Sequence, residues 1–532
     1  MKRVLLSLVI ISMFSCSKTK VDLIVHNADI YTVDNQFSKV SAVAVKDGKF
    51  VAVGSEKDIL NHYSAYQTLD ALGKSIYPGF IDGHCHFVGY GETKARYADL
   101  TGCESFMEVL ERLAEHDKNN DSEWLLGYGW DQNLWEVKEF PDNTGLHKRF
   151  PNKKVLITRI DGHSVLASSN ILKIIGLNEK SVVQGGEILL NRNGKPSGIL
   201  LDNAADMAKA IIPALNNTQR VNALKIAQRN CFALGLTCVT DAGLDIKSIV
   251  MIDSLQQQGV LKMKVNAMVN PDDETMDYFM KFGVIEKERL TVRSVKIYAD
   301  GALGSRGAKL LEPYSDAPET SGLIVENEDF YGHVCEKAHN AGYQVCCHAI
   351  GDGGVRMILN EYSKYLKGKN DLRWRVEHSQ IVNPQDFALY KEYSVIPSIQ
   401  ATHCASDMPW ARERLGSERI EYAYAYKTLL VQNGWLVNGT DFPIEQISPI
   451  LTFYASVARK DLIDNRLSRE EALKSMTIWA AKGYFAETRK GSIEIGKEAD
   501  FVILSDDIMT IADEKIPEVN VVNTFINGEM VY

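Results

Sequence analysis

Two histidines separated by one residue are the first sign of chemistry in this chain. His84 and His86 follow an apolar stretch, in the segment YPGFIDGHCH at positions 77–86. On an extended strand the side chains at i and i+2 leave the same face, so the two imidazoles converge while Cys85 points away. Imidazole is a common ligand of divalent metals. The pair predicts one side of a metal site, although an isolated His-x-His also occurs by coincidence.

Further polar side chains lie at the ends of apolar, strand-like segments. We predict eight strands, alternating with segments of helical periodicity, at residues 76–82, 237–241, 264–269, 292–298, 343–348, 373–378, 395–400 and 435–441. This alternation is typical of an α/β protein with a (β/α)₈ TIM barrel, whose catalytic residues gather at the C-terminal strand ends. The residues found at or just past those ends are His84, His86, Lys296, His348, His378 and Asp441.

The two ends of the chain differ from the middle. Residues 21–75 and 485–532 contain short alternating strands separated by turns, which predicts a small β-sandwich domain formed from both termini. The barrel would occupy residues 76–484. Roughly 150 residues separate its first two strands, far more than one helix and two loops require. We interpret about 100–220, with a β-hairpin near 181–203, as an insertion that covers the catalytic face; a merely decorative subdomain is the alternative.

Composition narrows the range of partners. The chain has 532 residues, of which 45% are hydrophobic and 24% charged, as in ordinary soluble globular proteins. A formal net charge of -10, without any Lys/Arg-rich block, argues against nucleic acid or an anionic membrane surface as a partner. We therefore expect a small-molecule substrate, and leave open whether the chain forms a homo-oligomer.

The first sixteen residues have the pattern of a signal peptide. Basic residues at positions 2 and 3 precede an apolar run at 4–14 that is too short to span a bilayer, and Ser15-Cys16 follows. This resembles the lipobox of bacterial lipoproteins, in which Cys16 would carry the lipid. The expectation is a protein of the bacterial cell envelope, facing the periplasm or the cell surface and touching the membrane only through its anchor; a plain secretory peptide is the alternative.

The other eight cysteines are dispersed over the chain and form no disulfide framework. None has the paired spacing of a structural zinc site, so we expect reduced thiols that do not bind the metal.

An ordered set of motifs resembles the amidohydrolase superfamily, specifically the subgroup of metal-dependent amidohydrolases that includes N-substituted formamide deformylase. The resemblance extends from about Val21 to Tyr532. It rests on PGFIDGHCH (78–86), GYGWDQNLW (127–135), DGHS (161–164), KIYADGALGSRGA (296–308), HAIGD (348–352), EHSQ (377–380) and GTDFP (439–443).

The resemblance implies a ligand set for two divalent ions. His84 and His86 would hold the first ion with Asp441, and His348 and His378 the second. Lys296 matches a lysine that relatives carboxylate to bridge the ions. This is chemically reasonable, because burial beside cations lowers the lysine pKa from about 10.4 and the neutral amine can take up CO₂. Zinc is the expected metal, with iron, manganese or nickel as alternatives, and a single ion with an unmodified Lys296 remains open.

The implied reaction is hydrolysis of an amide-type C–N bond in a linear N-acyl or N-formyl amine by a metal-activated hydroxide. Asp441 would accept the proton of the attacking water and pass it to the leaving amine, while His163 would donate to the carbonyl oxygen.

Four further residues are candidates for substrate contact. His403 and Asp407 follow the seventh predicted strand and match the family pattern, and Trp130 and Asp131 could close the pocket from the insertion. An aromatic residue such as Trp130 is as often part of a core.

Two other classes of function remain. A cyclic amide, carbamate or ester hydrolase would use the same site. A non-catalytic binding lipoprotein is disfavoured by the complete ligand set together with Asp441.

Overall fold

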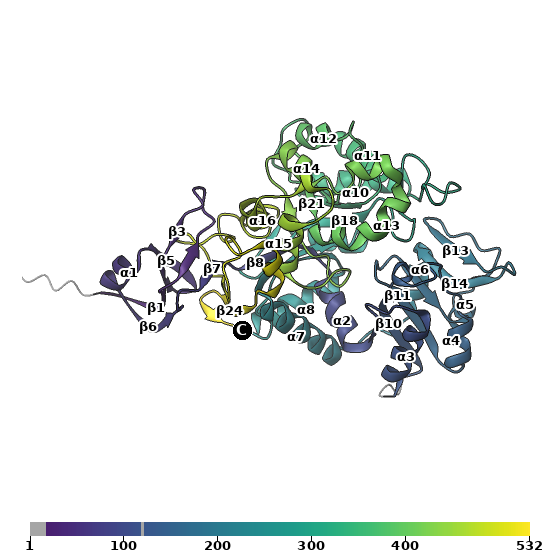
Figure 1. Cartoon of the computed structure of the whole chain (residues 1–532), viewed down its shortest axis with the longest axis horizontal. Helices are drawn as coiled ribbons and strands as arrows, with labels where there is room; N and C mark the ends of the chain where they lie inside the picture. The colour runs from purple at the N-terminus through teal and green to yellow at the C-terminus, as the bar shows by residue number, and fades with distance from the viewer. Residues whose placement is uncertain (1–17, 119–121) are drawn as a thin grey trace, which may run out of the picture.

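The computed structural model describes residues 18–118 and 122–532. The predicted lipid site at Cys16 lies outside these ranges. Sheets built from the two ends of the chain, a central barrel and a large insertion follow one another along the longest axis (Figure 1). Within the described ranges, no helix combines the length and apolar character needed to cross a bilayer.

The barrel contains eight strands, which pair in parallel in the order β22-β21-β20-β19-β18-β16-β15-β8. The last strand lies against the first, so the ring is nearly closed. This confirms the predicted fold class. The strands are β8 (Phe80–Cys85), β15 (Leu236–Leu244), β16 (Lys264–Val269), β18 (Leu290–Tyr298), β19 (Gln344–Ala349), β20 (Arg375–His378), β21 (Ile396–Ile399) and β22 (Val437–Asn438), with β17 (Ile285–Glu286) antiparallel to β18.

Helices surround the barrel, and local sequence signals set their ends. In α10 (Glu328–Ala341) the Asn327 side chain accepts a hydrogen bond from the Phe330 N–H at 2.9 Å, and Gly342 ends the helix with φ 70°. The other helices of the barrel are α2 (Phe87–Arg96), α7 (Asn217–Ala233), α8 (Ile246–Gln257), α9 (Asp273–Met280), α11 (Asp352–Ser363), α12 (Phe387–Glu392), α13 (Ala401–Arg419), α14 (Tyr426–Asn433), α15 (Pro449–Ala458), α16 (Arg469–Ser475) and α17 (Ile478–Lys482), with short 3₁₀ turns η2 (Ile420–Tyr422) and η3 (Ile463–Asn465).

The predicted first barrel strand, 76–82, is wrong in its bounds. The structure divides this segment between β7 (Ser75–Pro78), which belongs to a terminal sheet, and β8, which begins the barrel at Phe80. Both strands are fully buried, so in the sequence they look like a single buried strand. Pro78 and Gly79 separate them, and that dipeptide is the local signal of the break.

The chain ends form two sheets, in the orders β5-β4-β1-β6 and β25-β24-β23-β7-β2-β3. β7, from the N-terminal part, pairs antiparallel with β23, from the C-terminal part, so the second sheet requires both ends of the chain. The elements are β1 (Thr19–His26), β2 (Asp29–Tyr31), β3 (Lys39–Val40), β4 (Ala42–Lys46), β5 (Lys49–Gly54), α1 (Glu56–His62), β6 (Tyr63–Asp70), β23 (Phe501–Leu504), η4 (Asp513–Glu518), β24 (Val521–Ile526) and β25 (Glu529–Met530).

A buried ion cluster joins these sheets to the bottom of the barrel. Lys264, the first residue of β16, is 1% exposed. Its Nζ lies 2.5 Å from a Glu498 carboxylate oxygen, 2.6 and 2.7 Å from the two oxygens of Asp500, and 2.6 Å from Asn527 Oδ1. The ammonium is therefore fully compensated by oxygen atoms from the C-terminal residues.

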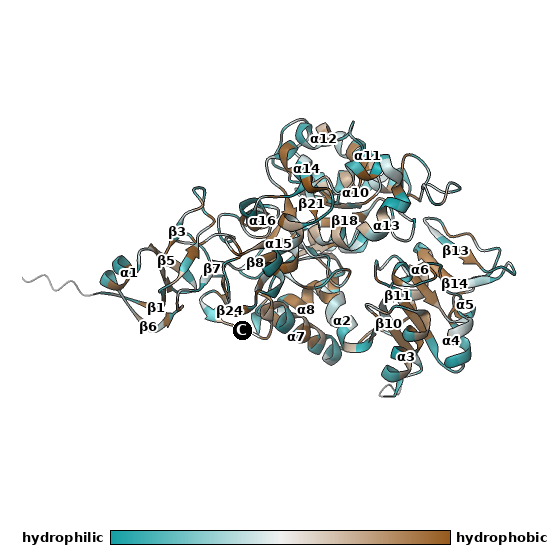
Figure 2. Cartoon of the chain, viewed as in Figure 1, coloured by the Kyte–Doolittle hydropathy of each residue, from teal (hydrophilic) through white to brown (hydrophobic). Residues whose placement is uncertain are grey.

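The insertion follows α2 and contains a sheet in the order β13-β14-β12-β11-β10-β9. β13 and β14 pair antiparallel, which confirms the predicted hairpin. Hydrophobic side chains concentrate in the barrel strands and in this sheet (Figure 2). The elements are β9 (Ala98–Asp99), α3 (Phe106–Asp117), β10 (Trp124–Trp130), η1 (Gln132–Leu134), α4 (Thr144–Arg149), β11 (Lys154–Arg159), β12 (Ser164–Ala167), α5 (Ser169–Ile174), β13 (Gly186–Leu190), β14 (Pro196–Asp202) and α6 (Asn203–Ala210).

All eight cysteines in the described part of the chain are buried and free, as expected from their dispersal.

Candidate metal centre and active site

The C-terminal ends of the barrel strands bring the six predicted ligand residues together. His84 lies near the end of β8 and His378 ends β20, while Asp441 comes three residues after β22. Lys296 and His348 lie near the ends of β18 and β19. Apart from His86, which is half-buried, these side chains are buried. A cavity of about 780 Å³ opens above them, lined by residues of the barrel and of the insertion.

Three of the six residues form a compact donor set. Ligand atoms of His84, His378 and Asp441 all lie within 4.8 Å of one another, and no other such group of three occurs within residues 18–118 and 122–532. His86 Nε2 approaches Asp441 Oδ1 at 3.3 Å and His84 Nε2 approaches it at 3.5 Å. His84, His86 and Asp441 thus converge as the resemblance implied.

Hydrogen bonds behind the histidines fix the direction of each ring. His84 Nδ1 lies 2.5 Å from Glu377 Oε2, and His378 Nδ1 lies 2.7 Å from Gln400 Oε1. Since both partners are acceptors, each Nδ1 carries the proton and each Nε2 keeps its lone pair for a metal.

Glu377 is ionised because Arg375 lies beside it. Arg375 Nε is 2.6 Å from Glu377 Oε1, and Arg375 Nη2 is 2.9 Å from Glu377 Oε2. Burial alone would raise the pKa of Glu377, but Arg375 and His84 outweigh burial and hold the pKa well below its ordinary value. Glu377 belongs to the EHSQ motif at 377–380, but no role was predicted for it. The signal was available, since Arg375 and Glu377 stand at i and i+2 on one strand face.

Lys296 and His348 complete the barrel side of the centre. Lys296 Nζ lies 3.2 Å from His84 Nε2, and burial lowers the pKa of Lys296, with nearby carboxylates opposing the effect. The rings of His348 and His378 are 4.5 Å apart, and His348 Nε2 faces the Gly301 carbonyl oxygen at 3.3 Å. The second predicted pair of histidines is thus adjacent.

Asp441 stands where the two sides of the centre meet. Its Oδ2 lies 3.5 Å from His403 Nε2 and 3.9 Å from His378 Nδ1. Burial raises the pKa of Asp441, but contact with His86 and the charges of the neighbouring histidines lower it to about 2. The carboxylate is ionised at neutral pH.

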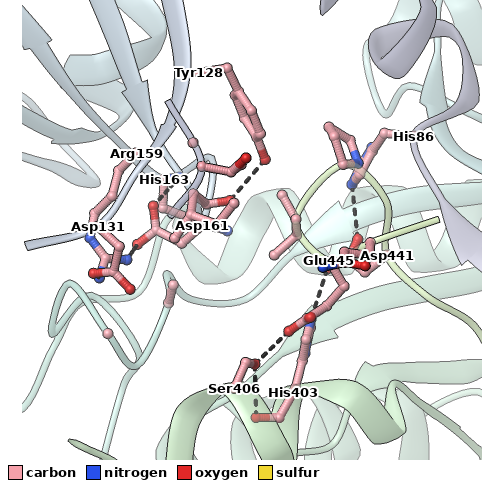
Figure 3. Close-up of a pocket in the computed structure, with 18 of the residues that line it drawn as sticks. His86, Tyr128, Asp131, Arg159, Asp161, His163, His403, Ser406, Asp441 and Glu445 are labelled. Carbon is pink, nitrogen blue, oxygen red and sulfur yellow. Dashed lines mark hydrogen bonds and ion pairs between the residues drawn. The ribbon is translucent and has the colours of Figure 1, made fainter. Parts of the chain in front are cut away.

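The insertion forms the opposite wall of the cavity (Figure 3). His163 lies just before β12, with its Nδ1 2.7 Å from Asp202 Oδ1, and its ring centre is 4.9 Å from that of His348. Arg159 bonds to both Asp131 and Asp161. His163, Asp131, His403 and Asp407, the residues predicted to act on or contact the substrate, all line the cavity.

Trp130 does not line the cavity, which corrects the prediction that it closes the pocket. Its indole is 0% exposed, donates to the Ile157 carbonyl at 3.1 Å and lies 5.9 Å from the Trp135 ring. Residues on a strand alternate between faces, so Trp130 enters the core of the insertion while the neighbouring Asp131 faces the site. No role was predicted for Tyr128, Arg159 and Glu445, which also line the cavity. Tyr128 belongs to the GYGWDQNLW motif at 127–135, so a signal was available for it, whereas Arg159 and Glu445 lie just outside the quoted motifs.

The side chains fit a divalent metal. Asp441 Oδ1 is buried and has no hydrogen-bond partner, although two imidazoles face it. An unsatisfied carboxylate oxygen beside imidazole nitrogens is costly in a buried place unless a cation binds there. Nitrogen and oxygen donors without a thiolate are ligands for zinc and similar ions.

The barrel and this donor set together define a metal-dependent hydrolase. A family model described as the amidohydrolase family matches residues 67–532, and the chain belongs to this family. It is a hydrolytic enzyme that acts on carbon–nitrogen bonds other than peptide bonds.

The similarity to individual relatives supports this family assignment. YtcJ of Bacillus subtilis (strain 168), whose name places it among amidohydrolases, is 30% identical over 525 residues, covering 95% of this chain and 98% of its own. N-substituted formamide deformylase of Arthrobacter pascens is 24% identical over 547 residues, covering 96% and 98%. A crystal structure of an uncharacterized metal-dependent hydrolase from Pyrococcus horikoshii OT3 superposes with a TM-score of 0.76 at 30% identity, covering 92% and 99%.

Proposed function

We propose that this enzyme hydrolyses linear N-acyl or N-formyl amines to a carboxylic acid and a free amine. The observation that carries the proposal is the convergence of His84, His378 and Asp441 at the base of a cavity large enough for a small substrate. The similarity to N-substituted formamide deformylase supports an amide of this type as the substrate.

Two divalent ions, with zinc as the first candidate, would be held by His84, His86 and Asp441 and by His348 and His378. When bound, such ions lower the pKa of water and polarise a carbonyl group. Lys296 would bridge the ions as a carbamate. Its buried amine supports this, because burial favours the neutral form that reacts with CO₂.

Asp441 moves the proton in this proposal. Its carboxylate is ionised and faces imidazoles through both oxygens, so it can accept a proton from the attacking water. The same group then gives that proton to the leaving nitrogen, because an amine leaves far more readily when it is protonated.

His163 positions the carbonyl group. Asp202 binds Nδ1, which leaves Nε2 of the half-buried ring for a substrate in the cavity. A donor fixed in this way stabilises charge that develops on the carbonyl oxygen during attack.

The test combines metal counting with a substrate panel on the purified chain. We expect two metal equivalents, turnover of N-formyl and N-acyl amines, and loss of both turnover and part of the metal in Asp441→Asn. Asp273→Asn, an exposed carboxylate outside the site, is the matched control. Turnover confined to cyclic amides, carbamates or esters would contradict the substrate proposal, and one equivalent of metal would contradict the bridge.

Carboxylation of Lys296 has its own test. Lys296→Ala should lose activity and regain part of it when a short carboxylate such as propionate is added, because the added carboxylate can replace the carbamate. Failure of rescue, together with an unmodified lysine mass in the native enzyme, would contradict the carbamate.

We further propose that Cys16 is lipidated and anchors the enzyme in the bacterial cell envelope. Cys16→Ser should move the protein from the membrane fraction to the soluble fraction. An unchanged distribution would contradict the anchor.

A further inference from the structure

The cavity carries more negative than positive charge even without Asp441. Asp131, Asp161, Asp407 and Glu445 line it, and Arg159 is bound to Asp131 and Asp161. Lys94 also lines the cavity but is paired with Asp99 at 2.9 Å. Among the described residues, neither Asp407 nor Glu445 forms an ion pair with a lysine, arginine or histidine.

Neutral hydroxyl groups bind these two carboxylates. The Tyr424 hydroxyl donates to Asp407 at 2.9 Å, and the Ser406 hydroxyl donates to Glu445 at 2.5 Å. The pKa of Asp407 is raised to about 7, mainly by burial; His403 lowers it and the charge of Glu445 raises it. Two carboxylates close enough to repel one another in a partly desolvated cavity are costly without a cation between them.

Two buried side chains beside this pair retain polar atoms without a hydrogen bond. His403 is 5% exposed and Gln380 is 3% exposed, and both line the cavity. Gln380 Nε2 is 2.9 Å from His403 Nδ1, and the nearest partner of His403 Nε2 is Asp441 Oδ2 at 3.5 Å, whereas Gln380 Oε1 has no hydrogen-bond partner. Buried acceptors are normally satisfied, so a ligand that donates a hydrogen bond to Gln380 Oε1 would supply what the protein lacks.

We propose that Asp407 and Glu445, together with the Gln380 amide, bind a positively charged nitrogen on the substrate. The substrate class is an N-acyl or N-formyl derivative of a diamine or another basic amine, with an ammonium group away from the scissile bond. The inference rests on the proposed hydrolysis of linear amides and names the substrate class of that site. Hydrolysis itself is unchanged: water adds to the carbonyl, the C–N bond breaks, and the proton goes to the leaving nitrogen.

The occupant is an organic cation rather than another metal ion. Within the described ranges, Asp407 and Glu445 do not join a third histidine, cysteine or carboxylate to make a compact donor set. An ammonium needs only two or three acceptors, and the nearby Tyr128 and Trp410 side chains can accommodate an alkyl chain.

The position of the charge limits the length of the substrate. His403 Nε2 lies 3.5 Å from Asp441 Oδ2, and His403 acts electrostatically on both Asp407 and Glu445. Figure 3 shows Glu445 beside His403 and Asp441. The second nitrogen therefore binds near the group that protonates the leaving amine, and a short chain of methylene groups joins the two nitrogens.

The test compares substrates of the same shape. On the metal-loaded enzyme, N-acetylputrescine should have a kcat/KM at least roughly tenfold above that of N-pentylacetamide, in which a methyl group replaces the ammonium. Calorimetry on the same protein should show tighter binding of butylammonium than of butanol, and weak binding of butyrate.

Variants assign the preference to the two carboxylates. Asp407→Asn and Glu445→Gln should each reduce the ratio of the two kcat/KM values by roughly tenfold. Asp99→Asn removes a charge elsewhere on the same cavity, where Lys94 already compensates it, and should leave the ratio unchanged.

The outcomes separate this inference from the proposed function. Equal kcat/KM values together with equal binding of butylammonium and butanol overturn the inference, while hydrolysis of neutral amides stands. If no amide is hydrolysed but butylammonium binds in preference, and Asp407→Asn abolishes that preference, the cation site is supported and the proposed function fails. An equal loss of preference in Asp99→Asn also overturns the inference, since the effect would then be one of overall charge.

Discussion

Two lysines are buried at opposite ends of the same barrel, and the structure treats them differently. Lys264, at the bottom, is surrounded by oxygen atoms of Glu498, Asp500 and Asn527 at 2.5–2.7 Å. Lys296, at the mouth, has a histidine nitrogen 3.2 Å away and no ion pair within the described residues. Both are 1% exposed.

The difference distinguishes a structural charge from a reactive one. A buried ammonium with several oxygen partners holds elements together and stays charged. A buried amine without such partners has a lowered pKa, because burial disfavours its charged form, and it is available for chemistry. Burial alone therefore does not identify an active-site lysine, whereas the lack of compensation does.

Substituting one carboxylate at each end of the barrel, Asp441 at the mouth and Asp500 at the bottom, should give the largest difference between the two ends. Asp441→Asn should reduce kcat/KM by about 10⁴-fold, because the group that we propose as both ligand and proton carrier is lost, and it should reduce stability by no more than about 2 kcal/mol. Asp500→Asn should mainly reduce the free energy of unfolding and leave kcat/KM nearly unchanged, since it weakens the ion cluster around Lys264. Steady-state kinetics and urea unfolding of both variants measure the two effects. Comparable losses of activity in the two would break the contrast.

Lys264→Met should reduce stability by about 3–5 kcal/mol, because Asp500 is left as a buried charge without its lysine and Glu498 keeps only its pairs with Lys490 and Arg489. Urea unfolding measures the change, and the kcat of the folded protein should stay close to that of the native enzyme. An unchanged unfolding midpoint would show that water or Lys490, 3.2 Å from Glu498, compensates the cluster.

Lys296→Met should show the opposite pattern, with kcat/KM lowered by at least ~100-fold and no loss of stability. The substitution removes the proposed metal bridge and, with it, a buried amine that has no ion pair among the described residues. Steady-state kinetics and urea unfolding measure the two effects, and the metal content of the purified variant is measured as well. A stability loss as large as that of Lys264→Met would mean that Lys296 is structural.

The sequence predicted which polar side chains meet at the mouth of the barrel, but it did not predict how Lys264 is neutralised at the bottom. His84, Lys296, His348 and Asp441 follow apolar runs, and the ends of parallel strands meet at one face, so their meeting could be foreseen. Nothing local connects Lys264 with Glu498 or Asp500, which lie over two hundred residues further along the chain. Such pairs depend on tertiary contacts that leave no periodic pattern.

The lack of a sequence pattern for tertiary contacts also explains the wrong bounds of the first barrel strand and the wrong placement of Trp130. The break between β7 and β8 was hidden in one buried apolar run, and Trp130 faces the core because its neighbour faces the site. Charge pairs across the insertion, such as Arg159 with Asp131, were also invisible, whereas the i,i+2 pair Arg375 and Glu377 was readable.

A smaller effect, on metal affinity, is expected for Glu377, which binds the ring of His84 from behind. Glu377→Gln should weaken metal affinity by about 10–100-fold, because the amide no longer holds the Nδ1 proton of His84 as firmly. Competition with a chelator measures the affinity, and the exposed Glu418→Gln is the control. Unchanged affinity would show that Arg375 alone preserves the geometry.

The smallest expected effect is a difference in acid stability between the native chain and Asp441→Asn. Asp441 has its pKa lowered from 3.8 to about 2, so its ionised form stabilises the fold above pH 4 and that stability is lost as the pH falls toward 2. The contribution is about 2 kcal/mol. Urea unfolding of the metal-free protein at neutral and acid pH should show this loss in the native chain and a smaller one in Asp441→Asn. Identical pH profiles would contradict the shift.

The antiparallel pairing of β7 with β23 has a consequence for biosynthesis. Until residues 498–504 leave the ribosome, the sheet that contains β7 has an open edge there, and Lys264 lacks the carboxylates that neutralise it. The fold therefore closes only after β23 has been made, and a nascent chain that stalls before Glu498 emerges would expose both an unpaired strand and an uncompensated charge to quality-control proteases.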